Sequence, residues 1–519
     1  MDVSRTAVAA PASSSSGAGV LQAVRSTVVA HWQVWPVVAV ALGLALVYLQ
    51  AAPIFALPFD DSYISLHFAR NLADHGFLTF DGETASAGAT SVLHVALLAL
   101  PIKAGVDPVR ASVALGITLH LGLVVAVYAL AWSIFRDRLV STVAAASTAV
   151  MGYLVLDALN GMETTLFLLV ATLAAAALFS AKGERGLLLA GVLGALAVLS
   201  RPEGVLLVAA MALYLAVDPD RDAPLVSPAT LRRLALLGAP SAIVLVALAA
   251  FYGATTGSVT PGAGTAKLFF FREFEMSLQM QFDAAQGSLA NFAGPVLPWL
   301  ALSAFAVRRR ELLLFAFFWV AFIVLYFALF PAGLTHYWYR YQHVVLPPVA
   351  VFGSAGLVAL ARGLRPRALD VVAAVAIGAV LVAYVGFQYN AFRNHYADDV
   401  IATDARQLDA ARYLRDETPP GSTVAAHDIG GLAFLSEREV IDLVGLVNPD
   451  ALDFHDGRRL REYIDEVQPD YVLVFLSWED RFLHLGLRDE PELFEPVQLF
   501  GVHGEPFVLY RTHYSAGAR

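Results

Sequence analysis

The chain has 519 residues, of which 58% are hydrophobic and 15% are charged, and its formal net charge is −10. A mean hydropathy of +0.64 excludes an ordinary soluble globular protein, and repeated apolar runs of about 18 or more residues indicate a polytopic helical membrane protein. The absence of cysteine excludes disulfides and thiolate metal sites, and nothing suggests a nucleic-acid partner.

Residues 1–30 contain the run AAPASSSSGAG and are predicted to form a disordered cytoplasmic tail. A further apolar segment at 90–105 is short and contains Pro101 and Lys103, so we expect it to be re-entrant or interfacial. Eleven other apolar segments are expected to cross the membrane, at about 34–57, 111–134, 139–157, 163–181, 187–200, 203–217, 232–253, 291–307, 312–330, 343–361 and 368–387.

Basic loops predict the orientation of these spans. The loops FRDR, KGER, LRR, RRR and RGLRPR together hold 12 Lys and Arg residues, and all five share one side only if 90–105 does not cross. Cytoplasmic loops carry an excess of Lys and Arg. We therefore expect a multi-pass protein of the inner or plasma membrane, with a cytoplasmic N-terminus and an extracytoplasmic C-terminus and catalytic face.

Residues 388–519 are richer in charge than the rest of the chain. Short β-rich runs at 422–435, 439–446, 469–476 and 506–514 are separated by Gly, Pro and Asp, and helical patterns occupy 405–417 and 459–468. The sequence therefore predicts a membrane catalytic domain over 31–387 and a soluble extracytoplasmic α/β domain over 388–519.

The segment PFDDSYISLHFARNLADHGFL (58–78) carries two adjacent carboxylates, Asp60 and Asp61, at the end of the first apolar run. Asp61 and Ser62 suit a helix N-cap and Gly76 suits a helix end, which predicts an amphipathic helix on the outer membrane surface. Acidic residues can end a span for structural reasons alone. Two in succession beside a surface helix favour a general base or a metal ligand.

The other predicted outer loops carry further charged residues. Glu163 lies in NGMET, Arg201 lies in SRPEG, and His336 and Arg340 lie among the aromatic residues of HYWYRYQH. Lys267 lies in a loop rich in Gly and Pro. SRPEG can also be a structural ion pair, and aromatic residues are normal at membrane interfaces. On one face, however, these cations suit a lipid phosphate.

Four segments in this order resemble the GT-C superfamily of membrane glycosyltransferases over about residues 35–360: DDSYISLHFARNLADHGFLTFDGE, GMETTLF, SRPEG and YRYQHVVLPP. The pattern is most similar to the mycobacterial terminal β-(1→2)-arabinofuranosyltransferase branch and its bacterial relatives, and VIDLVGLVNP (440–449) resembles a stretch of that branch. The resemblance implies a catalytic carboxylate at Asp60 or Asp61, a second acidic residue at Glu163, a polyprenyl-phospho-sugar donor and inversion at the anomeric carbon.

The predicted function is transfer of a sugar, with arabinofuranose as the candidate, from a polyprenyl-phospho-sugar to a hydroxyl on a glycan, lipid or protein. Asp60 is preferred as the general base because Asp61 suits the cap better. Asp61 is then a cap, an anchor or a ligand of a divalent metal, which the sequence leaves open. The residues assigned to the donor phosphate are Arg340, Arg201, Lys267 and His336.

The α/β domain is expected to recognise the acceptor through Asp428 and Asn448, although both residue types also cap turns. Two other classes of function remain open at this point. A transporter or flippase for lipid-linked sugars would place ionisable residues near the bilayer centre, where only Asp157 and His120 stand out. A non-catalytic scaffold of the same fold is the other alternative.

Overall fold

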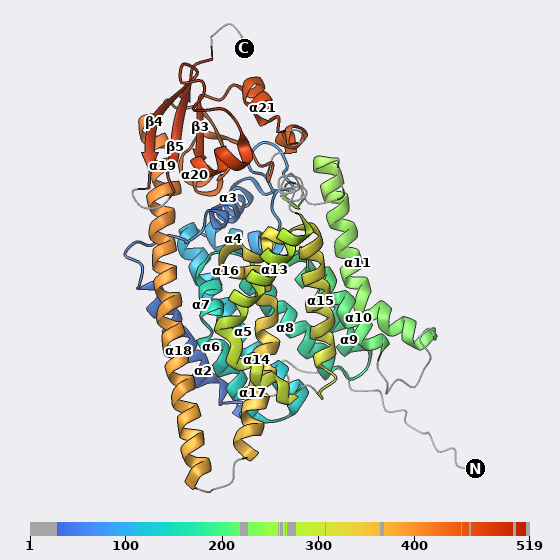
Figure 1. Cartoon of the computed structure of the whole chain (residues 1–519). Coiled ribbons are helices and arrows are strands. Elements are labelled where there is room, and N and C mark those ends of the chain that lie inside the picture. Colours follow the sequence, from blue (N-terminus) through green and yellow to red (C-terminus); the bar gives the residue numbers. More distant parts are fainter. Residues whose placement is uncertain are drawn as a thin grey trace, which may run out of the picture.

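The computed structural model shows a helical membrane part with a smaller sheet-containing part at one end (Figure 1). The residues that it describes are 29–217, 227–257, 259, 263, 264, 266, 277–306, 308–363, 368–447, 449–455, 458–501 and 505–514. Almost all of the predicted tail (1–30), together with Lys267 and Asn448, lies outside the described residues.

In the described part of the chain, five helical segments are long and apolar enough to cross a membrane: Pro108–Phe135, Pro228–Thr255, Leu278–Ala306, Leu312–Leu329 and Gly333–Gly363. Helices α6 (Arg138–Val150) and α7 (Gly152–Leu159) add a sixth if they form one span bent by 59°. Each overlaps one of the eleven predicted spans, although the spans at Leu278–Ala306 and Gly333–Gly363 begin earlier than predicted, and the count of eleven is not confirmed.

The helices of the membrane part, those within the spans and the others, pack together (Figure 1). Helix α5 is the span Pro108–Phe135, α15 is the span Leu312–Leu329, and α11 runs over Pro228–Thr256. The others are α2 (Val34–Leu49), α8 (Thr164–Ser180), α9 (Glu184–Ser200), α10 (Gly204–Ala216), α13 (Leu278–Ala293), α14 (Leu297–Ser303), α16 (His336–Tyr339), α17 (Leu346–Gly363) and α18 (Ala368–Thr403).

Two helices, α3 (Asp60–His75) and α4 (Val92–Lys103), pack against each other where the two parts meet (Figure 1). The 12 residues of α4 reach only about 18 Å at 1.5 Å per residue, too short for the hydrocarbon core. Gly76 ends α3 with φ +82°, as predicted. The predicted N-cap role of Asp61 is wrong, because α3 begins at Asp60 after an extended Phe59 and has no side-chain cap.

Helix α18 connects the two parts. It runs without interruption through 36 residues, so the domain boundary predicted at residue 388 falls inside one helix. Helix α19 (Asp409–Glu417) follows it and begins the sheet-containing part, which we call the tail part.

The tail part holds a five-stranded mixed sheet in the order β2-β1-β3-β5-β4. Its strands are β1 (Thr423–Ala426), β2 (Glu439–Asp442), β3 (Tyr471–Phe475), β4 (Phe494–Phe500) and β5 (Phe507–Thr512). Strand β1 pairs in parallel with β2 and β3, whereas β5 pairs antiparallel with β3 and β4. Along the chain, helices α20 (Gly430–Leu435), α21 (Leu460–Val467) and α22 (Leu476–Trp478) lie between these strands.

The sheet is buried on both faces, with alternate residues in two cores. Val424, Tyr471 and Leu473 belong to the core that extends into the membrane helices. Val472 and Val474 belong to a separate core on the other face. One face of the sheet is therefore packed toward the membrane part, which places α20 against α3.

Candidate functional site

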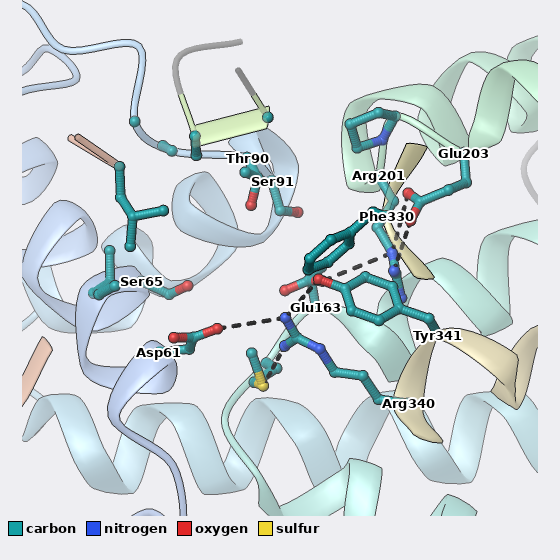
Figure 2. Close-up of a pocket in the computed structure, with 18 of the residues that line it drawn as sticks. Asp61, Ser65, Thr90, Ser91, Glu163, Arg201, Glu203, Phe330, Arg340 and Tyr341 are labelled. Atoms are coloured by element: carbon teal, nitrogen blue, oxygen red, sulfur yellow. Dashed lines mark hydrogen bonds and ion pairs between the residues drawn. The ribbon is translucent and has the colours of Figure 1, made fainter. Parts of the chain in front are cut away.

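A cavity of about 460 Å³ lies in the membrane part on the side of the tail part. Figure 2 shows its polar residues converging from α3, the loop before α8, the α9–α10 turn and the segment before α17. The polar and charged lining residues are Asp61, Ser65, Thr90, Ser91, Glu163, Arg201, Glu203, Tyr326, Arg340 and Tyr341. Four residues predicted from the sequence, Asp61, Glu163, Arg201 and Arg340, are thus brought together.

Asp61 faces this cavity from the first turn of α3, with 24% of its side chain exposed. Its Oδ2 atom lies 3.4 Å from Arg340 Nη2 and 3.8 Å from His336 Nε2. The Tyr337 hydroxyl donates to Oδ1 over 3.5 Å. This carboxylate therefore faces the cavity beside one cation and two other polar side chains.

Arg340 is buried and contributes a positive charge to the cavity. Besides Asp61, its Nη2 atom donates to the Tyr341 hydroxyl at 3.0 Å, and Nη1 lies 2.6 Å from Met162 Sδ. Its Nε is buried without a hydrogen-bond partner among the described residues. The guanidinium therefore keeps one unused donor.

Arg201 provides a second buried guanidinium. It donates from Nη2 to Glu203 Oε1 at 2.8 Å, and its Nε lies 3.8 Å from Glu163 Oε1. Within the described chain its Nη1 has no hydrogen-bond partner. The Tyr341 ring lies between the two cations, with its centre 4.7 Å from Arg201 Cζ and 4.8 Å from Arg340 Cζ. Arg201 and Glu203 of SRPEG thus form an ion pair, and Nη1 of Arg201 is a donor without a partner among the described residues.

Asp60 lies outside this cavity lining, although it is the neighbour of Asp61. It is buried, and its two carboxylate oxygens accept the backbone N–H groups of Gly430 and Gly431, each at 2.7 Å. Burial and the charge of Asp428 raise the pKa of Asp60 to about 8, against the opposing effect of the two N–H groups. The predicted preference for Asp60 as general base does not fit these surroundings.

The contact between Asp60 and Gly430 leaves no space for a side chain at residue 430. A Cβ atom on Gly430 would lie 2.0 Å from the backbone oxygen of Asp60. Further along α3, Arg70 donates to the carbonyl of Phe434, also in α20, at 3.0 Å. Asp60 therefore belongs to a close-packed contact between α3 and α20.

Asp428 also lies in the tail part, outside the cavity lining. It accepts a hydrogen bond from Gln407 Nε2 at 2.9 Å. Burial, followed by the charge of Asp61, raises the pKa of Asp428 to about 6 against the opposing hydrogen bond from Gln407. His336 contacts Asp61 but is absent from the lining.

The tail part also supplies one wall of the cavity through Leu446. Asp442 fixes this loop by accepting the N–H groups of Val444 at 2.9 Å and Val447 at 2.8 Å. The Ser86 hydroxyl donates to the Val447 carbonyl at 3.0 Å and joins the loop to the membrane part. The cavity is thus formed by both parts of the molecule.

Metal binding was left open by the sequence. Among the described residues, no group of three or more His, Asp or Glu side chains is arranged to hold a metal ion. Asp61 lies instead within ion-pair distance of Arg340 and His336. The structure therefore identifies no ligand set for a divalent metal.

Sequence reasoning missed several residues at this site. Tyr341 was attributed to an aromatic belt, yet it contacts both guanidinium groups. Tyr326 was not identified, yet its hydroxyl donates to Glu203. Thr90 and Ser91 line the cavity from the short segment before α4. Tyr341 lies within the YRYQH motif, which was the signal available for it. Tyr326 lies in a uniformly apolar helix that carries no such signal.

Two family models match parts of the chain. Residues 104–249 match the family described as dolichyl-phosphate-mannose-protein mannosyltransferase. Residues 394–516 match a domain of unknown function, DUF8728, over most of the tail part. No curated protein matches the chain in sequence.

Solved structures share the fold at low sequence identity. ArnT from Cupriavidus metallidurans, in the apo state, has a TM-score of 0.57 and 13% identity, and the match covers 93% of this chain and 98% of that chain. The archaeal oligosaccharyltransferase AglB from Archaeoglobus fulgidus, in complex with an inhibitory peptide and a dolichol-phosphate, has a TM-score of 0.52 and 13% identity, covering 94% and 75%. Residues 104–249 therefore match a glycosyltransferase family model, and the chain as a whole shares its fold with ArnT and AglB.

Proposed function

We propose that the chain transfers a sugar from a polyprenyl-phospho-sugar to an acceptor hydroxyl, with inversion at the anomeric carbon. The observation that carries this proposal is the pair of buried guanidinium groups, each with one nitrogen that has no described hydrogen-bond partner, beside three carboxylates that line the same cavity. The description of the matched family names dolichyl-phosphate-mannose, and the structure of AglB contains a dolichol-phosphate. Arabinofuranose is our candidate sugar because of the motif resemblance.

Arg201 and Arg340 are proposed to hold the donor phosphate. Guanidinium groups bind phosphate through charge-assisted hydrogen bonds, and Nη1 of Arg201 and Nε of Arg340 are unused. Leu325, Leu329 and Phe330 give the cavity an apolar side that suits a prenyl carrier. His336 supports this group through Asp61, and Lys267 remains a proposed contributor.

Asp61 is proposed as the general base, in place of Asp60. The acceptor oxygen bonds to the anomeric carbon while its proton moves to the Asp61 carboxylate. The bond from the anomeric carbon to the phosphate oxygen breaks, and its electron pair leaves with polyprenyl phosphate. Base assistance of this kind contributes about 10²–10⁴-fold to the rate.

Glu163 is proposed as the second acidic residue of the site. It lies 3.8 Å from Arg201 and faces the same cavity as Asp61. We assign it to orient Arg201 and to accept a hydroxyl of the bound sugar. The acceptor, a hydroxyl on a glycan, lipid or protein, is proposed to approach from the tail part, where Asp428 and Asn448 are our candidate contacts.

The proposed orientation places the N-terminus in the cytoplasm of an inner or plasma membrane and the tail part outside. The basic loops support it. The test uses Ser180→Cys and Glu417→Cys, because both positions are exposed and the native chain lacks cysteine. An impermeant reagent is expected to label only the second variant in intact cells; labelling only the first would contradict the orientation.

The function is tested with a panel of polyprenyl-phospho-sugars added to the purified protein. We expect one carrier to be consumed with release of polyprenyl phosphate, and the Asp61→Asn variant to leave it intact. If every carrier stays intact although polyprenyl phosphate binds, the result favours a transporter or a scaffold.

A further inference from the structure

Asp157 and His343 form a buried pair that the proposed reaction does not use. Asp157 lies in α7 with 2% of its side chain exposed, and His343 lies just before α17 with 1% exposed. Their Oδ2 and Nδ1 atoms are 2.7 Å apart. Because neither residue lines the cavity, the pair needs an explanation other than contact with substrate.

The second ring nitrogen of His343 has a partner in the segment that leads to Arg340. Its Nε2 atom lies 2.9 Å from the backbone oxygen of Trp338. A carbonyl oxygen only accepts hydrogen bonds, so Nε2 carries the hydrogen in the bond to Trp338, while Nδ1 is the nitrogen that faces Asp157. The imidazole therefore bridges α7 and the backbone at Trp338.

This backbone has an unusual conformation. Tyr337, Trp338 and Tyr339 are three consecutive residues in the left-handed region, with φ of 38°, 57° and 64°. Such a conformation persists where its surroundings fix it, and it is frequent at functional sites. The Trp338 indole N–H donates to Asp399 on α18 at 2.7 Å. The turn is thus held by its side chain on one side and by His343 on the other.

The turn delivers two residues that contact the proposed base. Tyr337 donates to Asp61, and Arg340, directly after the turn, forms an ion pair with it. Asp157 also accepts a hydrogen bond from Asn160 Nδ2 at 3.3 Å. The Asn160 carbonyl in turn accepts the Ser62 hydroxyl, next to Asp61. Asp157 is therefore connected to the turn before Arg340 through His343, and to the helix that carries Asp61 through Asn160 and Ser62.

We propose that His343, supported by Asp157, is a positioning residue that holds the 337–339 turn and so directs Arg340 toward Asp61 and the donor phosphate. The consequence for turnover rests on the proposed function, but the conformational consequence does not. A small displacement of Arg340 is sufficient for a large kinetic effect, because misplacing a catalytic group by about 1 Å costs about 100-fold in rate.

Two substitutions separate positioning from simple stabilisation. In His343→Gln the amide nitrogen reaches the place of Nε2 and keeps the bond to Trp338, whereas in His343→Asn it reaches the place of Nδ1 and keeps the bond to Asp157. We expect His343→Asn to lower kcat/KM by about 10- to 100-fold and His343→Gln to retain activity within about threefold. A purely structural ion pair predicts the reverse order, because Gln leaves the buried Asp157 charge without its partner.

Hydrogen exchange supplies a readout that needs no activity. Amides of residues 336–342 are expected to exchange faster in detergent-solubilised His343→Asn than in His343→Gln, even if no sugar donor is ever identified. Equal exchange in the two variants, or faster exchange in His343→Gln, would overturn the proposal. Faster exchange in His343→Asn with full turnover would overturn it as well, since the turn would then not position Arg340.

Discussion

Asp60 and Asp61 are neighbours in the chain, yet they belong to two different regions of the molecule. In the contact between α3 and α20, each Asp60 oxygen accepts a backbone N–H at 2.7 Å. In the cavity, Asp61 makes contacts of 3.4 to 3.8 Å with Arg340 and His336. One carboxylate is buried in the contact between two helices, and the other faces the cavity with 24% of its side chain exposed.

This difference separates a structural contact from a binding site. Buried polar groups are normally hydrogen-bonded, and among the described residues Arg201 Nη1 and Arg340 Nε are buried donors without a partner in two residues that line the cavity. Catalytic hydrogen bonds are often long until the substrate is present. The close-packed contact of Asp60, by contrast, would lose its partners if it took part in proton transfer.

The largest effect among these tests is expected on the cavity side. Arg201→Ala and Arg340→Ala each remove a donor to the leaving phosphate and are expected to lower turnover by about 10²–10³-fold. Steady-state kinetics with the identified donor measures this. The matched control is Arg232→Ala, whose exposed side chain pairs with Glu184, and it should retain nearly full activity. Near-normal turnover of both cavity variants would remove the phosphate assignment.

A smaller effect is expected on the tail side. Gly430→Ala places a methyl group 2.0 Å from the Asp60 backbone oxygen, so α20 must move away from α3. Overpacking of this kind costs about 1–3 kcal/mol, which a lowered melting temperature and a partial loss of activity would report. Gly378→Ala is the control, because nothing lies within 4 Å of its Cβ position. An unchanged melting temperature in Gly430→Ala would show that the contact is dispensable.

The smallest effect concerns pH. The pKa of Asp60 is raised from 3.8 to about 8, so between these values the folded chain holds a proton that the unfolded chain has released. Stability should therefore fall as pH rises through this window. Asp428 and Asp442 have pKa values of about 6, so the range from pH 6 to 8 reports mainly on Asp60 among the three.

Thermal unfolding at pH 6 and pH 8.5 measures this effect. We expect a lower melting temperature at the higher pH, and a smaller difference in Asp60→Asn, whose amide does not titrate. The same difference in the variant and the native chain would assign the pH dependence to other groups.

Much of the site could be predicted because its residues occupy predicted outer loops. Asp61, Glu163, Arg201 and Arg340 line one cavity although they are spread over nearly 280 positions. A single orientation of the spans is enough to predict that such loops share a face. Strands β1, β2, β3 and β5 were also predicted; β4 was missed because its central residues are mostly exposed and include Pro496.

The roles within the acidic pair could not be predicted. Local helix rules assign Asp61 to the N-cap, but the helix begins one residue earlier. What decides the direction of each carboxylate is Gly430 and Gly431, which are about 370 residues away and bring two N–H groups to Asp60. No local pattern encodes that contact. The same holds for the 337–339 turn, whose conformation depends on His343 and Asp399.

The most direct test measures turnover and thermal stability of Asp60→Asn and Asp61→Asn in parallel. We expect Asp61→Asn to keep its melting temperature and to lose about 10²–10⁴-fold in kcat. Asp60→Asn is expected to lose stability, because its NH₂ group opposes one backbone N–H, while the folded fraction still transfers sugar. A stable, inactive Asp60→Asn beside an active Asp61→Asn would contradict the assignment of the reacting carboxylate.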